Sequence, residues 1–428
     1  MTTRANGRID PRLCIMMFLQ YAAVGVCAPI LPSYLQTNVE DGGLGFSVYQ
    51  VGWILAIAPA IGSMLAPFIA GQFVDRHVAT ERYLAAAFLV SGAAQWFLSY
   101  QHSFPAWAAL SLVFALGFYP TIGLANALAM AHLRDAQTQF PRVRVWGTVG
   151  WVVVAWTFPM LFLQESFEFR STLPFFGGAD RSDATARIAM ALQVSAAISF
   201  GFAVFCLLLP NTPPKQSGKD RFAFVTAFRL LRHRSLIILI FVSIALAAMD
   251  RILLLQTAPY LQSVGVRTSQ VMPAMAIGQL AEIVMMLLLG HVLKRIGFRF
   301  ALLLGAFCYV LRFIIFAAPA LSLEVIVGSQ LLHGICFACA FIVVAIYIDR
   351  LAPPDARNSA QSGLTLAVMA PGAILGGLLN GLLGTWFTVG GRIYYSSLWY
   401  SCAGISVAAF LGLFFLFRDE SEKRGNAE

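Results

Sequence analysis

The sequence predicts an all-α, polytopic membrane protein, and three observations support that prediction. Hydrophobic residues make up 59% of the 428 positions and charged residues only 11%, with a mean hydropathy of +0.76. A soluble domain carries roughly 25% charged residues, so most of this chain's surface must face hydrocarbon. Apolar segments long enough to cross a bilayer core of about 30 Å recur along the whole chain, and basic residues lie mainly on one side of them.

The apolar segments predict twelve transmembrane helices, six in each half of the chain. The first six cover approximately residues 12–36, 48–72, 82–100, 104–131, 142–164 and 188–209. The second six cover approximately residues 235–262, 268–291, 300–318, 322–348, 358–386 and 393–417. The first segment is longer than the apolar region of a signal peptide, so we expect it to be an uncleaved helix.

A basic, proline-rich segment separates the two groups of six. Residues 210–234 open with Pro210, Pro213 and Pro214 and contain six basic side chains. Placing this linker and both termini on the cytoplasmic side leaves only five basic residues on the other side, which satisfies the positive-inside rule. The net charge of +9 then faces anionic lipid heads, and it requires no nucleic-acid partner. We therefore expect helical bundles at residues 1–209 and 235–417, with a cytoplasmic tail at 418–428.

An internal repeat supports two equivalent halves. Gly71, Asp75 and Arg76 lie at the cytoplasmic end of the second span, and Gly290 and Arg295 lie at the same end of the eighth span. In both copies an arginine follows a glycine by five residues. The glycine would permit a close approach of two helices, and the charges would anchor a movable loop at the interface. Six plus six helices with a long inner linker is the layout of the major facilitator fold, two pseudo-symmetric six-helix bundles.

Ionisable residues inside the predicted spans are the candidate functional residues, because a charge at mid-bilayer costs about 2.5–3.5 kcal/mol on insertion scales. Arg144, Thr148 and Trp151 lie at i, i+4 and i+7 of the fifth span and therefore share one helix face. They offer a fork of donors, a hydroxyl and a stacking surface to a solute with polar and aromatic parts. Alternatively, Arg144 extends to the cytoplasmic interface.

Carboxyl groups occur in two further spans. Gln279 and Glu282 share a face of the eighth span, and Glu282 is a candidate proton carrier, with a protonated structural glutamate as the alternative. Asp250 and Arg251 are neighbours in the seventh span and point about 100° apart, so each is expected to seek a separate partner. Glu282 is a candidate partner for Arg251, and an ion pair that only joins helices is the alternative.

Further polar or aromatic positions complete the candidate set. Gln20 is expected to face a central cavity from the first span, and His333 and Phe337 form a polar and aromatic face in the tenth. A histidine in such a position can equally be a satisfied packing residue. Arg312 of the ninth span is interpreted as structural.

At these residues the chain resembles the nucleoside:proton symporter family of the major facilitator superfamily. The matching stretches run in order along nearly the whole chain: Phe18-Leu-Gln-Tyr21, Tyr119-Pro-Thr-Ile-Gly-Leu-Ala-Asn126, Phe140-Pro-Arg-Val-Arg-Val-Trp-Gly-Thr-Val-Gly150, Gln279-Leu-Ala-Glu282, Leu311-Arg-Phe313 and Arg357-Asn-Ser-Ala-Gln361. The fifth-span block is the most specific of these. The glycine motifs belong to the wider superfamily.

The resemblance implies proton-driven uptake by alternating access. It carries a role in binding a nucleoside to the residues that match the family's contacts: Arg144, Thr148, Trp151 (where the family tends to have Phe), Gln279, Glu282 and Phe337. Two departures affect coupling and selectivity. Ala338 stands where the family has an acidic residue, and Arg251 and Leu254 stand at the family's polar positions in the seventh span. A relocated carboxyl, Glu282 or Asp250, would then carry the proton.

The sequence thus predicts a monomeric secondary transporter of a bacterial inner membrane that imports nucleosides with protons. A proton-coupled sugar transporter and a nucleoside facilitator with altered coupling are the alternatives, followed by a drug exporter and by a receptor that binds a solute without moving it. We expect no enzyme, cofactor or metal site, because the sequence offers neither a nucleophile–base set nor a metal-ligand cluster.

Overall fold

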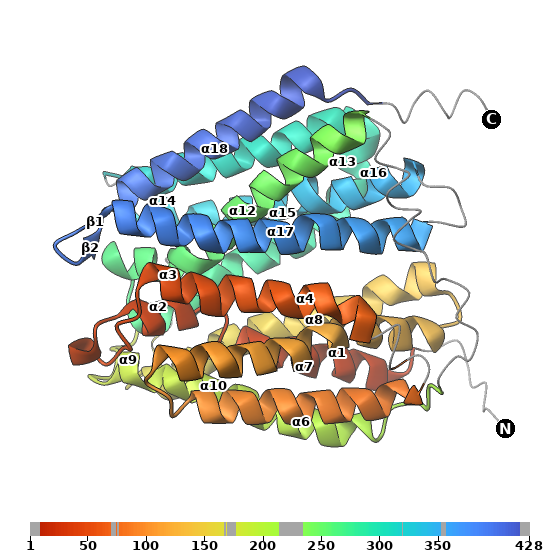
Figure 1. Ribbon diagram of the computed structural model, residues 1–428, viewed down its shortest axis with the longest axis horizontal. Helices are drawn as coiled ribbons and strands as arrows, with labels where there is room; N and C mark the ends of the chain where they lie inside the picture. The colour runs from red at the N-terminus through yellow and green to blue at the C-terminus, as the bar shows by residue number, and fades with distance from the viewer. Residues whose placement is uncertain are drawn as a thin grey trace. The chain divides into compact units, whose positions relative to one another are not determined.

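Helices form almost all of the regular structure of the chain (Figure 1). The computed structural model describes residues 9–69, 74, 77–166, 168, 177–213, 234–318, 320–351 and 357–419, and every structural statement below concerns these residues. The chain divides into two compact units. Unit 1 comprises Met1–Gly45, Ile61–Phe167 and Ala179–Gly218, and unit 2 comprises Phe46–Ala60, Glu168–Gly178 and Lys219–Glu428.

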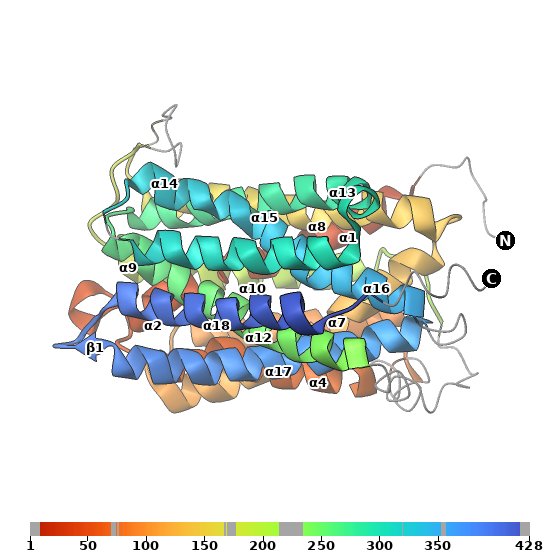
Figure 2. The same cartoon turned by 90° about the horizontal axis from the view of Figure 1, so that it is seen from above.

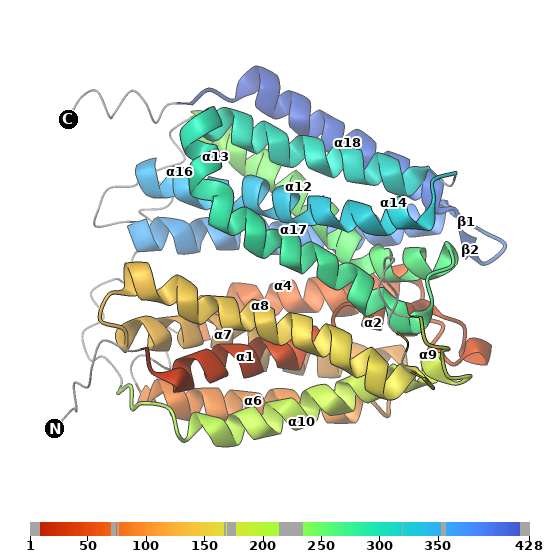
Figure 3. The same ribbon diagram turned by 180° about the vertical axis from the view of Figure 1, so that it is seen from behind.

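Unit 1 is a bundle of long helices with short helical turns between them. Its elements are α1 (Pro11–Gly25), α2 (Leu31–Gln36), η1 (Val39–Asp41), most of α4 (Ala58–Phe68), α6 (Thr80–Leu98), α7 (Phe104–Ala131), α8 (Ala136–Phe158), the π-helical turn η4 (Pro159–Leu163), α9 (Ala184–Arg187) and α10 (Ala189–Cys206). Helix α1 packs along α8 and α10, and α6 packs against α7 and α10 (Figures 1 and 3). These contacts leave α8, which bears three candidate residues, directly against α1.

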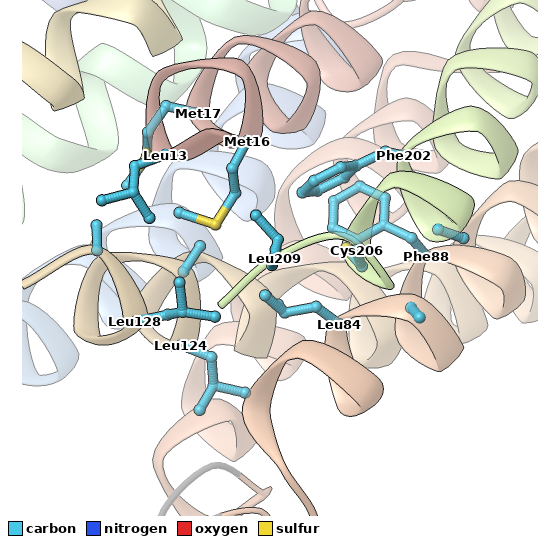
Figure 4. Packing of buried hydrophobic residues seen from close by; sticks show 14 of the residues in the cluster. Leu13, Met16, Met17, Leu84, Phe88, Leu124, Leu128, Phe202, Cys206 and Leu209 are labelled. Carbon is cyan, nitrogen blue, oxygen red and sulfur yellow. The ribbon is translucent and has the colours of Figure 1, made fainter. Parts of the chain in front are cut away.

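The core of unit 1 is a cluster of buried aliphatic and aromatic side chains (Figure 4). Leu13 and Met16 of α1 meet side chains of α6, α7 and α10 there. Phe88 of α6 packs edge-on against Phe202, at a centroid distance of 4.4 Å, and against Phe118, at 5.9 Å. Edge-to-face pairs of this kind add about 0.5–1.5 kcal/mol beyond area burial, so the cluster fixes the mutual positions of these helices.

The first predicted span, residues 12–36, is interrupted in the structure. It begins as expected, because the Asp10 carboxylate caps α1 by accepting the Arg12 backbone N–H at 2.9 Å and Pro11 occupies the first helical position. The α-helix then ends at Gly25 and resumes at Leu31. Pro29 and Pro32 explain the break, because each lacks the N–H that a continuous helix would need and its ring clashes with the carbonyl four residues earlier.

Unit 2 contains the remaining helices and a two-residue hairpin. Its elements are α3 (Val48–Gly52), the π-helical turn η2 (Trp53–Ile57), α12 (Arg234–Ser263), α13 (Thr268–Ala317), α14 (Leu323–Gly328), the 3-10 turn η5 (Ser329–Leu331), α15 (Leu332–Phe337), the π-helical turn η6 (Ala338–Ile342), α16 (Val343–Leu351), α17 (Arg357–Trp386), β1 (Thr388–Val389), β2 (Arg392–Ile393) and α18 (Tyr395–Leu416). The antiparallel strands pair Thr388 with Ile393. Helix α12 contacts both α17 and α18 (Figure 2), and α13 contacts α18 and α15 (Figure 3).

Trp399 of α18 forms the aromatic centre of unit 2. Its fully buried indole lies against Tyr260 of α12 at a centroid distance of 5.6 Å, and against Phe313 and Phe316 of α13 at 5.8 Å and 5.3 Å. Aromatic side chains bury about 150–250 Å² each, so these four rings hold α12, α13 and α18 together. The same packing holds the second half of α13, which carries Tyr309 and Arg312, in a fixed position.

Helical segments occur at all twelve predicted spans. Nine helices of the described chain are long and apolar enough to cross a membrane by length and composition. One of them, α13, is two helices joined at Gly297, whose φ of 74° and ψ of 175° break the helix, so it accounts for the predicted spans 268–291 and 300–318. The all-α polytopic prediction is confirmed. For the interrupted first span and for α6, the crossing of a bilayer stays a prediction.

Candidate functional site

In unit 1, Arg144 lies on the face of α8 that packs against α1. Its guanidinium carbon lies 4.1 Å from the centroid of the Tyr21 ring, within the range of a cation–π contact. Gly147 makes this contact possible, because a Cβ at that position would lie 2.7 Å from Tyr21 Cδ2 and 2.8 Å from Arg144 Nη1. The Tyr21 ring therefore orients the guanidinium of the half-buried Arg144, and Gly147 leaves the space that this contact needs.

Trp151, two turns further along α8, packs on α1 in a similar way. A Cβ added at Gly25 would lie 2.9 Å from Trp151 Cα and 3.0 Å from two atoms of its indole ring. Trp151 and Thr148 are both half-buried. Tyr21 and Gly25, one turn apart on α1, thus position Arg144 and Trp151. Helix α1 therefore packs against the predicted shared face of α8.

Gln20 lies next to Tyr21 on α1 but is fully buried. Its Nε2 donates a hydrogen bond of 3.3 Å to Thr121 Oγ1 of α7. This contact joins α1 to α7 within unit 1. The expected role of Gln20 in facing a solute stays a prediction.

In unit 2, Gln279 and Glu282 of α13 lie against α15 and the turn that precedes it. Gly334 of α15 touches the backbone of α13, since a Cβ there would lie 2.3 Å from the Ala281 carbonyl carbon and 2.5 Å from the Glu282 nitrogen. Gly278 makes the reciprocal approach, with Cβ of His333 3.1 Å from its ideal Cβ position. Both polar side chains are half-buried. The close backbones explain how His333 comes within reach of Gln279.

Arg312 of α13 is the centre of a polar network in unit 2. It is 4% exposed. Its Nη1 lies 3.2 Å from His333 Nδ1, and its Nη2 donates a hydrogen bond to Gln330 Oε1. His333 Nε2 lies 3.5 Å from the side-chain amide of Gln279. The network therefore extends from a buried arginine to a candidate solute contact.

Asp250 and Arg251 contact different partners, as their divergent directions on α12 predict. Tyr309 donates a hydrogen bond of 2.8 Å from its hydroxyl to Asp250 Oδ1. Arg251 is half-buried, and its Nη1 lies 3.5 Å from the Leu55 carbonyl oxygen, at the outer limit of a hydrogen bond. Asp250 is thus held by a side chain of α13, and Arg251 points elsewhere.

Phe337 lies at the end of α15, at centroid distances of 6.2 Å from His333 and 5.5 Å from Phe341. The next residue, Ala338, is fully buried and begins the π-helical turn η6. Such turns are frequently found at functional sites. Where the resemblance expects a carboxyl group, the chain thus has the buried methyl group of Ala338, at the start of η6.

The two copies of the glycine–arginine motif can be described only in part. Gly71, Asp75 and Arg76 lie outside the described residues. Gly290 and Arg295 precede the break of α13 at Gly297, and Arg295 is exposed. A Cβ at Gly290 would meet no heavy atom of the described chain within 4 Å, so the close helix approach expected there is not found.

Tyr309 and Gln330 were not among the predicted site residues, although Tyr309 holds Asp250 and Gln330 accepts from Arg312. The signal was present in the sequence. Tyr309 and Arg312 lie three residues apart on one helix, and Gln330 and His333 also lie three residues apart. The spacing rule that selected Gln279 and Glu282 would have selected both pairs.

Comparisons with known proteins identify the family of the chain. The model of the nucleoside H+ symporter family matches residues 8–422. The nucleoside permease NupG of Escherichia coli (strain K12) is 24% identical over 429 residues, covering 94% of this chain and 95% of that protein. The xanthosine permease of the same organism is 26% identical over 430 residues, covering 96% and 95%.

Solved structures show the same fold. The crystal structure of the nucleoside transporter NupG matches with a TM-score of 0.81 at 21% identity, covering 96% of this chain and 99% of that chain. A bacterial homologue of the human lysosomal transporter Spinster matches with a TM-score of 0.70 at 14% identity, covering 96% and 97%. The predicted fold class is therefore confirmed. Because the family model spans nearly the whole chain, this protein belongs to the nucleoside H+ symporter family.

Proposed function

We propose that this protein imports nucleosides together with protons by alternating access between two helical bundles. The observation that carries the proposal is the family match over residues 8–422, since it includes every candidate site residue. The expected bundles are residues 1–209 and 235–417, joined by the linker 210–234. Movement of one bundle relative to the other would expose a central solute site alternately to each side of the membrane.

The side chains on the two units suit a nucleoside, which combines a polar sugar with a flat base. Arg144, oriented by Tyr21, offers two parallel N–H donors to an acceptor edge. Trp151 and Phe337 supply ring faces for stacking the base. The remaining proposed contacts supply donors and acceptors: Thr148, Arg251, Gln279, Glu282, His333 and the fully buried Gln20.

Two carboxyl groups are proposed to couple the solute to protons. Glu282 is half-buried beside Gln279, and Asp250 accepts a hydrogen bond from Tyr309. A protonated carboxyl group is neutral, so it moves through an apolar environment at lower free-energy cost than a carboxylate. Protonation of Glu282, with Asp250 as a second site, would therefore permit the loaded carrier to reorient. Gly71, Asp75, Arg76, Gly290 and Arg295 are proposed to hold the loops that open and close on the cytoplasmic side.

Uptake of radiolabelled uridine and adenosine into proteoliposomes, with and without an inward proton gradient, tests the proposal. We expect accumulation above equilibrium only when the gradient is present, and competition by unlabelled nucleosides. If hexoses and pentoses compete and nucleosides do not, the protein is a sugar transporter. If export of varied organic cations is observed instead, it is a drug exporter.

Facilitated diffusion of nucleosides is a second candidate, favoured by one residue. Ala338 is fully buried at the position where the resemblance expects an acidic residue. If neither Glu282 nor Asp250 replaces that carboxyl group, uptake would equilibrate without concentrating the solute. The same experiment separates the two, because a facilitator gives equal final levels with and without the gradient.

The setting of the protein is also part of the proposal. We place the protein as a monomer in a bacterial inner membrane, with both termini and the linker in the cytoplasm. The exposed apolar side chains of the long helices, such as Leu287 at 81% and Phe241 at 69% exposure, would face lipid. Labelling of single cysteines at the termini with a membrane-impermeant reagent tests the orientation.

A further inference from the structure

The hydrogen-bond network around His333 determines which end of the Gln279 side chain is free to bind. Arg312 Nη1 lies 3.2 Å from His333 Nδ1, and the side-chain nitrogen Nε2 of Gln279 lies 3.5 Å from His333 Nε2. Arginine has five N–H donors and no acceptor. His333 Nδ1 must therefore accept from Arg312, which means that it carries no proton.

The state of the imidazole ring follows from that contact. A histidine whose Nδ1 accepts is neutral and carries its single proton on Nε2. That Nε2–H points at the amide of Gln279, so the amide must present an acceptor. The nitrogen and oxygen of a glutamine amide are assigned from the hydrogen bonds around them. With Nε2 toward His333, two N–H donors would face each other, so the two ends are exchanged and the carbonyl oxygen Oε1 faces His333. The NH2 group of Gln279 is then directed away from His333.

We infer that Arg312 and His333 act as positioning residues that fix the Gln279 amide with its two N–H donors toward the solute. The inference rests on the proposed function, in which Gln279 contacts the nucleoside. It specifies that Gln279 donates in this contact. The nucleoside must therefore offer a hydrogen-bond acceptor there, which is a carbonyl oxygen or ring nitrogen of the base or a sugar oxygen. Glu282, one turn away on α13, supplies the opposite polarity when ionised.

Burial keeps this arrangement in place. Arg312 is 4% exposed, and its second hydrogen bond, to Gln330 Oε1, fixes the plane of the guanidinium. Gly278 and Gly334 bring the backbones of α13 and α15 together, and the His333 ring packs over Gly278, with Cδ2 3.3 Å from the position of a Cβ there. A reversed imidazole, with the proton on Nδ1, would place two donors face to face and leave a buried arginine N–H without an acceptor, which is unfavourable.

The test measures how strongly uridine analogues inhibit labelled uridine uptake in reconstituted protein. Each analogue changes the acceptors of one part of uridine: 2′-, 3′- and 5′-deoxyuridine lack one hydroxyl group, the riboside of pyrimidin-2-one lacks the O4 carbonyl oxygen and the N3 proton, and 2-thiouridine carries sulfur in place of O2. In the wild type, we expect one analogue to bind about ten-fold more weakly than uridine. This is the loss of affinity expected when a Gln279 N–H donor has no acceptor on the bound analogue. In Gln279→Leu, that same ratio should fall to within about two-fold, because the donor is gone.

His333→Phe decides the inference, because it keeps a ring of similar size but removes both ring nitrogens. We expect the analogue ratio to fall as in Gln279→Leu, since the amide can now rotate. His333→Gln retains an acceptor for Arg312 and a donor for Gln279, so it should restore most of the ratio. A purely structural role for His333 would change transport rates in both variants without changing the ratio.

The outcomes separate this inference from the proposed function. A full wild-type ratio in His333→Phe, together with its loss in Gln279→Leu, would overturn the positioning role while leaving nucleoside transport intact. The positioning role would also be overturned if no analogue showed an affinity ratio that changes between the wild type and Gln279→Leu. If His333→Phe fails to yield folded protein, Arg312→Met gives the same test, because it frees the imidazole tautomer. Absence of uridine uptake in the wild type would remove both the inference and the proposed function.

Discussion

Arg144 of α8 can contact Tyr21 of α1 because Gly147, one turn further along α8, has no side chain. A Cβ at position 147 would lie 2.8 Å from Arg144 Nη1 and 2.7 Å from Tyr21 Cδ2. Glycine inside a helix is less stable than alanine by about 0.5–1 kcal/mol. The chain therefore accepts a less stable helix at a position where alanine would displace the guanidinium, which supports a functional reason for the contact.

Gly147→Ala is expected to weaken nucleoside binding while leaving the fold intact. Displacing the guanidinium from the Tyr21 ring removes its fixed orientation, and the loss of about 0.5–2 kcal/mol should raise KM for uridine uptake about 2- to 30-fold. The matched control is Gly201→Ala in α10, where a Cβ would meet nothing within 4 Å. Concentration-dependent uptake rates measure KM for both variants, and equal KM values would contradict the role given to this contact.

His132 provides a pH prediction at the end of α7, outside the membrane-spanning segment. Its Nε2 lies 2.9 Å from Thr212 Oγ1, and burial lowers the pKa of its imidazole below the ordinary 6.5. The unfolded chain therefore binds this proton more readily than the folded one. The contribution of His132 to stability is present above pH 6.5 and is lost as the pH falls through the lowered pKa.

Thermal unfolding of the detergent-solubilised protein between pH 5 and 8 measures this effect. The wild type should unfold at a lower temperature on the acidic side. His132→Gln retains an N–H donor for Thr212 but cannot titrate, so its unfolding temperature should depend less on pH over the same range. Equal pH dependence in both proteins would show that other groups control it.

At the scale of elements, the contact between α13 and α15 is set by Gly334. A Cβ there would lie 2.3 Å from the Ala281 carbonyl carbon, closer than any real contact. Gly334→Ala is therefore expected to force the helices apart and to destabilise the protein by about 1–3 kcal/mol, as overpacking does. Gly328→Ala, in the same span but with open space around it, is the control. Unfolding temperatures compare the two, and an unchanged value in Gly334→Ala would refute the tight contact.

The positions of the helices could be predicted from the sequence, because each needs about 20 apolar residues to cross the bilayer and charged residues are rare within them. The interruption of the first span was missed because hydropathy is insensitive to Pro29 and Pro32, which are tolerated in an apolar run. The break of α13 at Gly297 lies in the interval between the predicted spans 268–291 and 300–318, and only the positive φ that forms it was not predicted.

The candidate site could be predicted where its members share one helix, and not where they come from several. Arg144, Thr148 and Trp151 follow from a spacing of four and three residues. The contact of Arg312 with His333 joins two spans, and that of His333 with Gln279 joins a third predicted span to them. Spacing within a helix contains no information about such contacts. Arg312, interpreted as structural, is buried and connects through His333 to a candidate solute contact.

At the scale of the whole molecule, each unit contains its own set of polar side chains supported by close helix contacts. In unit 1, α1 positions the residues of α8 through Gly25 and Gly147. In unit 2, α15 positions those of α13 through Gly278 and Gly334. In each unit, the glycines at these contacts let neighbouring helices pack closely. This close packing keeps the polar side chains of each set in fixed positions relative to one another.

Energy coupling is the property that requires the whole molecule, and it is tested by removing the carboxyl groups. Glu282→Gln keeps the size of the side chain but cannot exchange a proton. We expect this variant to exchange labelled for unlabelled nucleoside across the membrane, and to lose accumulation driven by the proton gradient. Asp250→Asn, which preserves an acceptor for the Tyr309 hydroxyl, should lower that accumulation.

Glu40→Gln in the exposed turn η1 is the control for the loss of a carboxyl group and should accumulate nucleoside as the wild type does. Accumulation ratios at fixed gradients measure coupling, and exchange rates measure the ability to reorient. If Glu282→Gln still concentrates nucleoside, Glu282 does not carry the proton. If Asp250→Asn also does so, the coupling passes through neither carboxyl group. Exchange that persists while accumulation fails would place the proton on Glu282, because only the step that links proton to solute is then lost.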